Sequence, residues 1–173
     1  MPKIIENLEA RLIAEAKKQL QEAGYSMLTI RSVAKGCGVG VGTVYNYFPS
    51  KDALLATFML ESWNVCVEKI QSTSKESVEP RPVARCVYDQ LLWFSDEHRV
   101  IFCDEAAASA FAGSFGYYHK LLRAQLAAPM RKFCNSDFAA EFVAEALLVW
   151  TMSGKEFDDI YGILENNLNR AVS

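Results

Sequence analysis

Hydrophobic residues recur every three or four positions along most of the chain, which is the spacing of one face of an α-helix. The first segment of this kind has apolar positions at Ile4, Ile5, Leu8, Leu12, Ile13, Ala16 and Leu20. Pro2 stands where a first helical turn tolerates proline, and Gly24 stands where a helix C-cap belongs. The pattern therefore predicts an amphipathic helix over residues 3–23.

Glycines punctuate the next segment densely, since five of the nine glycines fall between positions 24 and 42. Thr29 is placed to cap a short helix within this segment. A second short helix follows Gly40 and ends near Phe48 and Pro49. Two short helices joined by a turn that contains glycine are the helix-turn-helix arrangement.

The remainder of the chain is also helical in its pattern. Ser50 is placed to cap a longer helix that runs to about Ser72, and a polar loop with Pro80 and Pro82 follows it. Further helices are predicted over residues 83–96, 100–113, 115–134, 137–153 and 155–171. No segment alternates apolar and polar residues for long, so we expect no sheet and an all-α fold.

Composition restricts the class of protein. The chain has 173 residues, of which 51% are hydrophobic and 23% charged, which suits a folded protein of one or two domains. It has no run of about 18 uncharged apolar residues, and its start lacks the apolar region of a signal peptide. We therefore expect no membrane partner and a cytoplasmic location.

The net charge of −3 argues at first against a nucleic-acid partner. The charge is unevenly distributed, however. Residues 1–60 hold seven Lys or Arg and five Asp or Glu, a net of +2, which leaves −5 for the rest. Attraction to phosphates is therefore expected from the N-terminal part only.

Cysteines and histidines do not form a familiar site. The five cysteines are scattered without a C-x-x-C pair, which argues against a disulfide framework and a structural zinc site. We expect reduced, mostly buried thiols and no cofactor, and a redox-sensing thiol stays open. A metal site that combines His98 and His119 with Asp104 or Glu105 also stays open, although the spacing fits no compact ligand motif.

The helix-turn-helix segment carries a long ordered motif. Gly24-Tyr25 is followed, from Thr29 to Lys51, by TIRSVAKGCGVGVGTVYNYFPSK. Over about residues 10–60 the chain resembles the DNA-binding domain of the TetR family of transcriptional repressors. The resemblance implies a helix-turn-helix DNA-binding domain at residues 1–50. A long helix would join it to a helical ligand-binding and dimerisation domain at residues 51–173.

The second short helix is the candidate recognition helix. Hydroxyl groups in and after it can bind phosphate oxygens, Asn46 can pair with adenine, and the methyl groups of Val41 or Thr43 can touch a thymine methyl. The resemblance implies DNA contacts for Thr43, Tyr45, Tyr47 and Lys51. The full set of candidate DNA-binding residues is Thr29, Arg31, Val41, Gly42, Thr43, Tyr45, Asn46, Tyr47 and Lys51. Many relatives have a serine at position 40 and a basic residue at position 41. Gly40 still serves as an N-cap, whereas Val41 removes a phosphate or guanine contact, so the base specificity of those relatives is not carried over to this chain.

Aromatic residues are dense in the C-terminal part, and the family resemblance implies an inducer cavity among its helices. The candidate lining residues are Trp93, Phe102, Cys103, Phe111, Phe115, Tyr118, His119 and Trp150. For any one of them a role in the hydrophobic core is the alternative. The expected ligand is a small apolar or aromatic inducer.

The last two predicted helices carry apolar stripes that suit a two-fold helical interface. The candidate dimerisation residues are Phe138, Phe142, Ala146, Val149, Ile160, Ile163, Leu164 and Leu168. A homodimer would place two recognition helices on successive major grooves of a palindrome. The alternative is that both stripes pack inside one chain.

These features together predict a ligand-responsive transcriptional regulator, a repressor that an inducer releases from a palindromic operator in double-stranded DNA. An enzyme is not expected, because the sequence has no nucleophile–base pair, metal motif or phosphate loop. The alternative function is a helical protein-interaction module that keeps the helix-turn-helix only as a scaffold.

Overall fold

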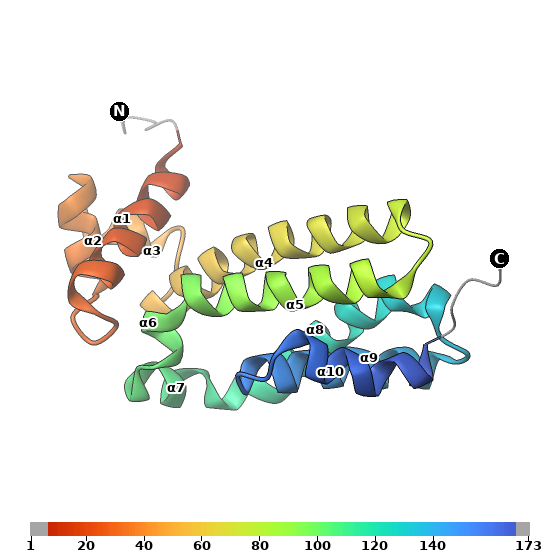
Figure 1. The fold of residues 1–173 in the computed structure, drawn as a ribbon. Helices are drawn as coiled ribbons and strands as arrows, with labels where there is room; N and C mark the ends of the chain where they lie inside the picture. The colour runs from red at the N-terminus through yellow and green to blue at the C-terminus, as the bar shows by residue number, and fades with distance from the viewer. Residues whose placement is uncertain (1–6, 169–173) are drawn as a thin grey trace. The chain divides into compact units, whose positions relative to one another are not determined.

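The computed structural model describes residues 7–168, apart from the side chains of Ser114, Phe115 and Asn167. Within this range the regular structure is entirely helical, with ten α-helices and three short 3-10 turns (Figure 1). The predicted all-α fold is confirmed. None of the described helices is both long and apolar enough to cross a membrane.

Contacts divide the chain into two compact units. The first runs up to Glu61 and also includes His98–Gly113, and the second comprises Ser62–Glu97 and the chain from Ser114 onward. The first unit therefore contains the start of the long helix that follows the helix-turn-helix. It also contains a segment that lies far along the sequence, in the part expected to bind ligand.

Three helices open the first unit, α1 (Leu8–Ala23), α2 (Ile30–Cys37) and α3 (Val41–Tyr45), and the last two form the helix-turn-helix. The N-cap of α2 is Thr29, as predicted, and it forms a reciprocal capping box with Ser32. Gly24 and Gly38 end α1 and α2 with φ of 80° and 67°, a backbone conformation that favours glycine. These local signals fix the lengths of the helices and the turns between them.

A single hydrophobic core holds the first unit together. Its fully buried leucines, such as Leu12, Leu28 and Leu54, each stabilise the fold by about 1.5–3 kcal/mol relative to an exposed side chain. Val33 and Val44 join α2 and α3 to this core. Ile101 and Ala107 belong to the same cluster, which explains why the segment around them is part of this unit.

Two long antiparallel helices follow, α4 (Lys51–Glu76) and α5 (Pro80–Glu97). Their side-by-side packing is shown by contacts between Trp63 and Phe94 and between the thiol of Cys66 and the carbonyl of Gln90 (Figure 1). Helix α4 runs four residues beyond the predicted end at Ser72.

The predicted loop around the two prolines is also shorter in the structure. Pro80 opens α5 and Pro82 lies in its first turn, where the missing N–H group costs no hydrogen bond. The predicted start of this helix at residue 83 was therefore three residues late.

The prediction of one helix over residues 100–113 was wrong. The segment consists of α6 (Arg99–Phe102), α7 (Glu105–Phe111) and a 3-10 turn (Ala112–Ser114). The reason is Asp104, whose carboxylate accepts hydrogen bonds from the N–H groups of Ala106 and Ala107 and so starts a new helix. An apolar period alone does not reveal such an internal cap.

The second unit is completed by α8 (Phe115–Met130), α9 (Asp137–Met152) and α10 (Phe157–Leu164), with 3-10 turns at Arg131–Phe133 and Glu165–Asn167. Helix α9 packs against α5, α8 and α10. The last helix was predicted over residues 155–171, but it ends at Leu164, and residues 169–171 lie outside the described range.

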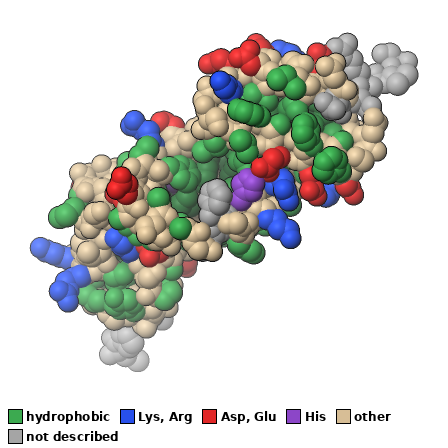
Figure 2. Space-filling view, turned by 90° about the horizontal axis from the view of Figure 1, so that it is seen from below, with side chains coloured by type: hydrophobic (Ala, Val, Ile, Leu, Met, Phe, Trp, Pro, Cys, Tyr) green, Lys and Arg blue, Asp and Glu red, His purple; other side chains and the backbone are tan. Residues whose placement is uncertain are grey.

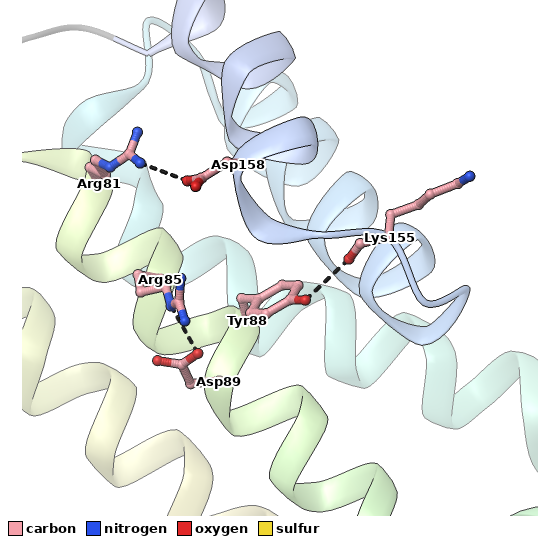
Figure 3. Close-up of polar contacts among 6 residues, drawn as sticks. All are labelled: Arg81, Arg85, Tyr88, Asp89, Lys155 and Asp158. Carbon is pink, nitrogen blue, oxygen red and sulfur yellow. Dashed lines mark hydrogen bonds and ion pairs between the residues drawn. The ribbon is translucent and has the colours of Figure 1, made fainter.

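Polar and aromatic contacts fasten α10 to α5 (Figure 3). Arg81 pairs with Asp158 at 2.7 Å, and the hydroxyl of Tyr88 donates to the carbonyl oxygen of Lys155 at 3.2 Å. The Arg81 and Arg85 guanidinium groups lie 5.5 and 5.1 Å from the centre of the Phe157 ring. Both arginine side chains stay more than half exposed, so these cation–π contacts lie at the surface.

Candidate nucleic-acid interface

Helix α3 presents uncharged polar groups to solvent. Val44 is fully buried and anchors the helix. Tyr45 and Tyr47, on either side of Asn46, are 54% and 45% exposed. Such large exposed aromatic side chains with hydroxyl groups, at the end of a short helix and in the turn after it, suit contact with a partner surface.

The other predicted residues of α3 complete the same surface. Asn46 and Gly42 are exposed, and Val41 and Thr43 are partly buried. Apart from its chain neighbours and the backbone of its own helix, no heavy atom lies within 4 Å of the place that a Cβ atom of Gly42 would occupy, so no other side chain crowds this position. The five side chains and the glycine thus lie on one short segment, as the sequence predicts.

Thr29 and Arg31 lie at the start of α2. The Thr29 hydroxyl accepts from the Ser32 N–H at 3.0 Å, so its first role is to cap the helix. Arg31 is exposed in the first helical turn. Arg31 is thus the candidate of the set that brings a positive charge from α2.

The Lys51 ammonium group makes two contacts with Tyr25 that the sequence does not reveal. Its ammonium group donates to the carbonyl oxygen of Tyr25 at 3.1 Å and lies 3.7 Å from the centre of the Tyr25 ring. The Tyr25 hydroxyl donates to Asp52 Oδ1 at 2.6 Å. Burial, together with the hydrogen bond to the Asp52 carboxylate, raises the pKa of Tyr25 to about 12.

Sequence reasoning missed Tyr25 and Asp52 as members of this site. The motif includes Tyr25 without assigning it a role, and it ends before Asp52. In the structure Gly24 has a positive φ, and the Tyr25 that follows it is buried.

The candidate ligand residues are shared between the two units. Phe102, Cys103 and Phe111 belong to the first unit, and Trp93, Tyr118, His119 and Trp150 belong to the second. Phe115 opens α8, but its side chain lies outside what the structure describes. Neither unit by itself brings the whole set together.

The side chains of this set are only partly covered. Trp93, Phe102, Tyr118 and Trp150 are each exposed by between 43% and 50%, and Phe111 packs partly against the core of the first unit. Cys103 lines a shallow open depression with Ser26, Asp104, Glu105 and Ala106. These exposed aromatic groups do not have the full burial of core residues.

Charged side chains cluster between α8 and α9. His119 Nε2 lies 3.2 Å from Glu145 Oε1, and Arg123 Nη1 lies 3.9 Å from the other oxygen of the same carboxylate. Arg123 also pairs with Glu141 at 3.8 Å. His119 thus takes part in a charge network that spans two helices.

The candidate dimerisation residues fall into two groups. Phe138 and Ile163 are 77% and 72% exposed, and Phe142 and Val149 are also exposed. Ala146 is partly buried. Ile160, Leu164 and Leu168 instead pack into the core of their own unit, so an interface would rely on the exposed group. Hydrophobic side chains exposed on one face of the molecule are seen in Figure 2.

The cysteines and histidines form no metal cluster among the residues that the structure describes. All five cysteines lie in that range and are thiols. Burial raises the pKa of Cys37 and Cys134, and it raises the pKa of Cys66 to about 11. These three are therefore poor nucleophiles at neutral pH.

His98 is buried with its ring 4.5 Å from that of Phe58, and Asp104 caps α7.

Comparison with known proteins identifies the N-terminal segment. Residues 12–57 match the family model described as bacterial regulatory proteins, tetR family. The uncharacterised HTH-type transcriptional regulator YuxN of Bacillus subtilis is 28% identical over 92 residues, 51% of this chain and 32% of YuxN. The chain thus matches about a third of the length of its curated relatives.

Solved structures agree with the fold over nearly the whole chain. A putative transcriptional regulator from Streptomyces coelicolor, SCO7518, superposes with a TM-score of 0.68 at 14% identity and covers 91% of this chain and 95% of its own. The structure of a SmeT–triclosan complex gives a TM-score of 0.60 at 13% identity, over 84% of this chain and 79% of SmeT. These likenesses show the fold, and the names of YuxN and SCO7518 are those of transcriptional regulators.

Proposed function

Because residues 12–57 match the family model of bacterial regulatory proteins, tetR family, we propose that the protein is a DNA-binding transcriptional regulator that reads its operator with α3. The observation that carries the proposal is the exposed row of Tyr45, Asn46 and Tyr47, which ends α3 and continues into the turn after it, next to the buried Val44. A helix of this kind fits the major groove. Such a regulator acts in the cytoplasm of a bacterial cell, where the DNA lies.

The side chains of α3 and of the turn after it suit two kinds of DNA contact, to phosphates and to a base edge. Hydroxyl groups of Thr43, Tyr45 and Tyr47 are suited to phosphate oxygens, which set the position of the protein without reading sequence. Asn46 offers the amide that pairs bidentately with adenine, a contact worth about 1–3 kcal/mol of discrimination against other bases. With no Lys or Arg in α3, binding should depend less on bulk charge than in more basic domains.

Dimerisation is the second part of the proposal. A five-residue recognition helix contacts few bases, and two copies about 34–36 Å apart would read a palindrome. Phe138, Phe142 and Val149 are spaced by four and seven residues, which places them on one face of α9, and all three are exposed. Together with the exposed Ile163 on α10, they support a second copy of this chain as the partner.

Response to a small molecule is the third part. Partly exposed aromatic side chains in the C-terminal part suit a small apolar or aromatic inducer, and the similar fold of SmeT has been captured with triclosan. We infer that the inducer releases the protein from its operator, with repression as the default state. Linkage then requires that operator and inducer weaken each other by the same factor.

Gel mobility shift with fragments of the source genome tests the proposal directly. The wild-type protein should select a small number of fragments, and binding should weaken as salt rises. Asn46→Ala should lose most of this selectivity, because the base-reading amide is gone. Met27→Ala is the matched control, since Met27 is 69% exposed in the turn before α2 and is not part of the proposed surface.

The alternative is a protein-interaction module that keeps the helix-turn-helix as a scaffold. That function predicts no sequence-selective, salt-sensitive DNA complex for the wild-type protein. Equal binding of all fragments, or none, would therefore contradict the regulator. Equal operator affinity with and without a saturating inducer would contradict only its ligand response.

A further inference from the structure

Tyr25 makes polar contacts with its own turn and with the start of α4, although it is only 3% exposed. It lies in the turn between α1 and α2. Its carbonyl oxygen accepts from the Leu28 N–H at 3.3 Å and from the Lys51 ammonium at 3.1 Å. Its hydroxyl donates to Asp52 at 2.6 Å. One buried residue thus ties the turn after α1 to the first turn of α4.

The ring and the carbonyl oxygen of Tyr25 together restrict the position of the Lys51 ammonium group. The ammonium nitrogen lies 3.7 Å from the centre of the Tyr25 ring, a close cation–π distance. One of its three N–H donors goes to the Tyr25 carbonyl, so two donors remain for other acceptors. A lysine side chain otherwise gives up about 2 kcal/mol of rotamer entropy when it is ordered by a ligand.

The place of Lys51 in the fold makes this restraint useful for anion binding. Lys51 is the first residue of α4, a helix of 26 residues, and the N-terminus of a helix carries partial positive charge. The neighbouring Asp52 carboxylate would repel a phosphate. The Tyr25 hydroxyl engages one oxygen of this carboxylate, which competes with a bond between Asp52 and the Lys51 ammonium.

We propose that Tyr25 is a positioning residue for DNA binding, whose ring and carbonyl hold the Lys51 ammonium ready to bind a DNA phosphate. Tyr25 itself does not touch DNA, because its side chain is buried. The inference rests on the proposed function, and it assigns to a core residue an effect on DNA affinity. It also accounts for how a domain with only +2 net charge would hold its register on the backbone.

Binding of a fluorescein-labelled, mixed-sequence 40-base-pair duplex at several KCl concentrations tests this inference. A phosphate contact does not depend on sequence, so the operator need not be known. Lys51→Gln should weaken binding several-fold and lower the salt slope by about 0.9 per lost contact. Tyr25→Leu should reproduce both effects. Tyr25→Phe keeps the ring and the carbonyl, so it should bind within about twofold of wild type.

A double-mutant cycle separates positioning from general damage to the fold. Tyr25→Leu should add no further loss of affinity to Lys51→Gln, because the group that it positions is already gone. It should still weaken a Lys18→Gln variant, in which the same charge is removed from an exposed position on α1. Additive effects of Tyr25→Leu and Lys51→Gln, or wild-type affinity in a folded Tyr25→Leu protein, would overturn the inference and leave the proposed function intact.

NMR of the wild-type protein supplies a readout that requires no variant to fold. The ring current of Tyr25 should shift the ε-methylene protons of Lys51 upfield, and addition of the duplex should perturb this signal. An unshifted signal would contradict the contact between the Lys51 ammonium and the Tyr25 ring. A wild-type protein that binds no duplex at low salt would overturn the proposed function and this inference together.

Discussion

At the scale of single residues, the helix-turn-helix unit combines buried side chains that set geometry with exposed ones that offer hydrogen bonds. Val44 and Tyr25 are buried, and they carry the exposed Tyr45, Asn46 and the half-buried Lys51. Substitution of a buried member should therefore change stability, DNA affinity or both. Substitution of an exposed member should change DNA affinity alone.

The hydroxyl of Tyr25 gives the protein a defined response to high pH. Burial and the Asp52 hydrogen bond raise the pKa of Tyr25 to about 12, above the ordinary value of 10.0. The protonated phenol is thus favoured in the folded state. Its contribution to the free energy of unfolding is complete below pH 10 and is lost as the pH rises through 12.

The difference in absorbance at 295 nm between the wild-type protein and Tyr25→Phe isolates the titration of this phenol. The midpoint should lie near pH 12 and should fall in Asp52→Asn, which removes the carboxylate charge. A midpoint near pH 10 in the wild type would contradict the described hydrogen bond.

At the scale of elements, Gly38 and Gly42 should respond differently to substitution by alanine. Gly38 ends α2 with φ of 67°, whereas Gly42 lies within α3 with open space around its missing Cβ. Gly38→Ala should cost about 1–2 kcal/mol, because an alanine is strained in the left-handed region. Gly42→Ala should be neutral or stabilise by up to about 1 kcal/mol.

Urea unfolding followed by circular dichroism compares these two variants. Since the alanine methyl at position 42 would stand on the exposed face of α3, Gly42→Ala should also weaken DNA binding without loss of stability. Equal stability of the two variants would contradict the assigned backbone geometry.

The attachment of α10 to α5 also depends on a few residues. The Arg81 guanidinium lies 4.9 Å from the centre of the Tyr161 ring and 5.5 Å from that of Phe157. Arg81→Ala should lower the free energy of unfolding by about 1 kcal/mol, mainly through lost stacking. Asp158→Asn should change it by less than about 0.5 kcal/mol, because both members of this ion pair are more than half exposed. Thermal unfolding of the two variants tests this ranking.

At the scale of the whole molecule, the exposed apolar face of α9 and α10 supports assembly of two copies. Phe142→Glu should convert a dimer to a monomer in sedimentation at micromolar protein, because a charge would be buried in the interface. Val78→Glu is the matched control, since Val78 is 74% exposed in the loop between α4 and α5. A wild-type protein that sediments as a monomer would contradict the proposed interface.

The sequence by itself determined the local features, which depend only on residues close together along the chain. The Thr29 cap, the Gly24 C-cap and the two short helices joined by a turn that contains glycine are all local, and each agrees with the structure. Only the tertiary structure decided which distant segments pack together. His98–Gly113 joins the first unit through Ile101 and Ala107, and Tyr25 meets Lys51 across 26 positions of sequence. Ile160 and Leu164 turn inward although their apolar period suits an interface equally well. The physical reason is that a periodic pattern shows which face of a helix is apolar, whereas long-range packing decides what covers that face.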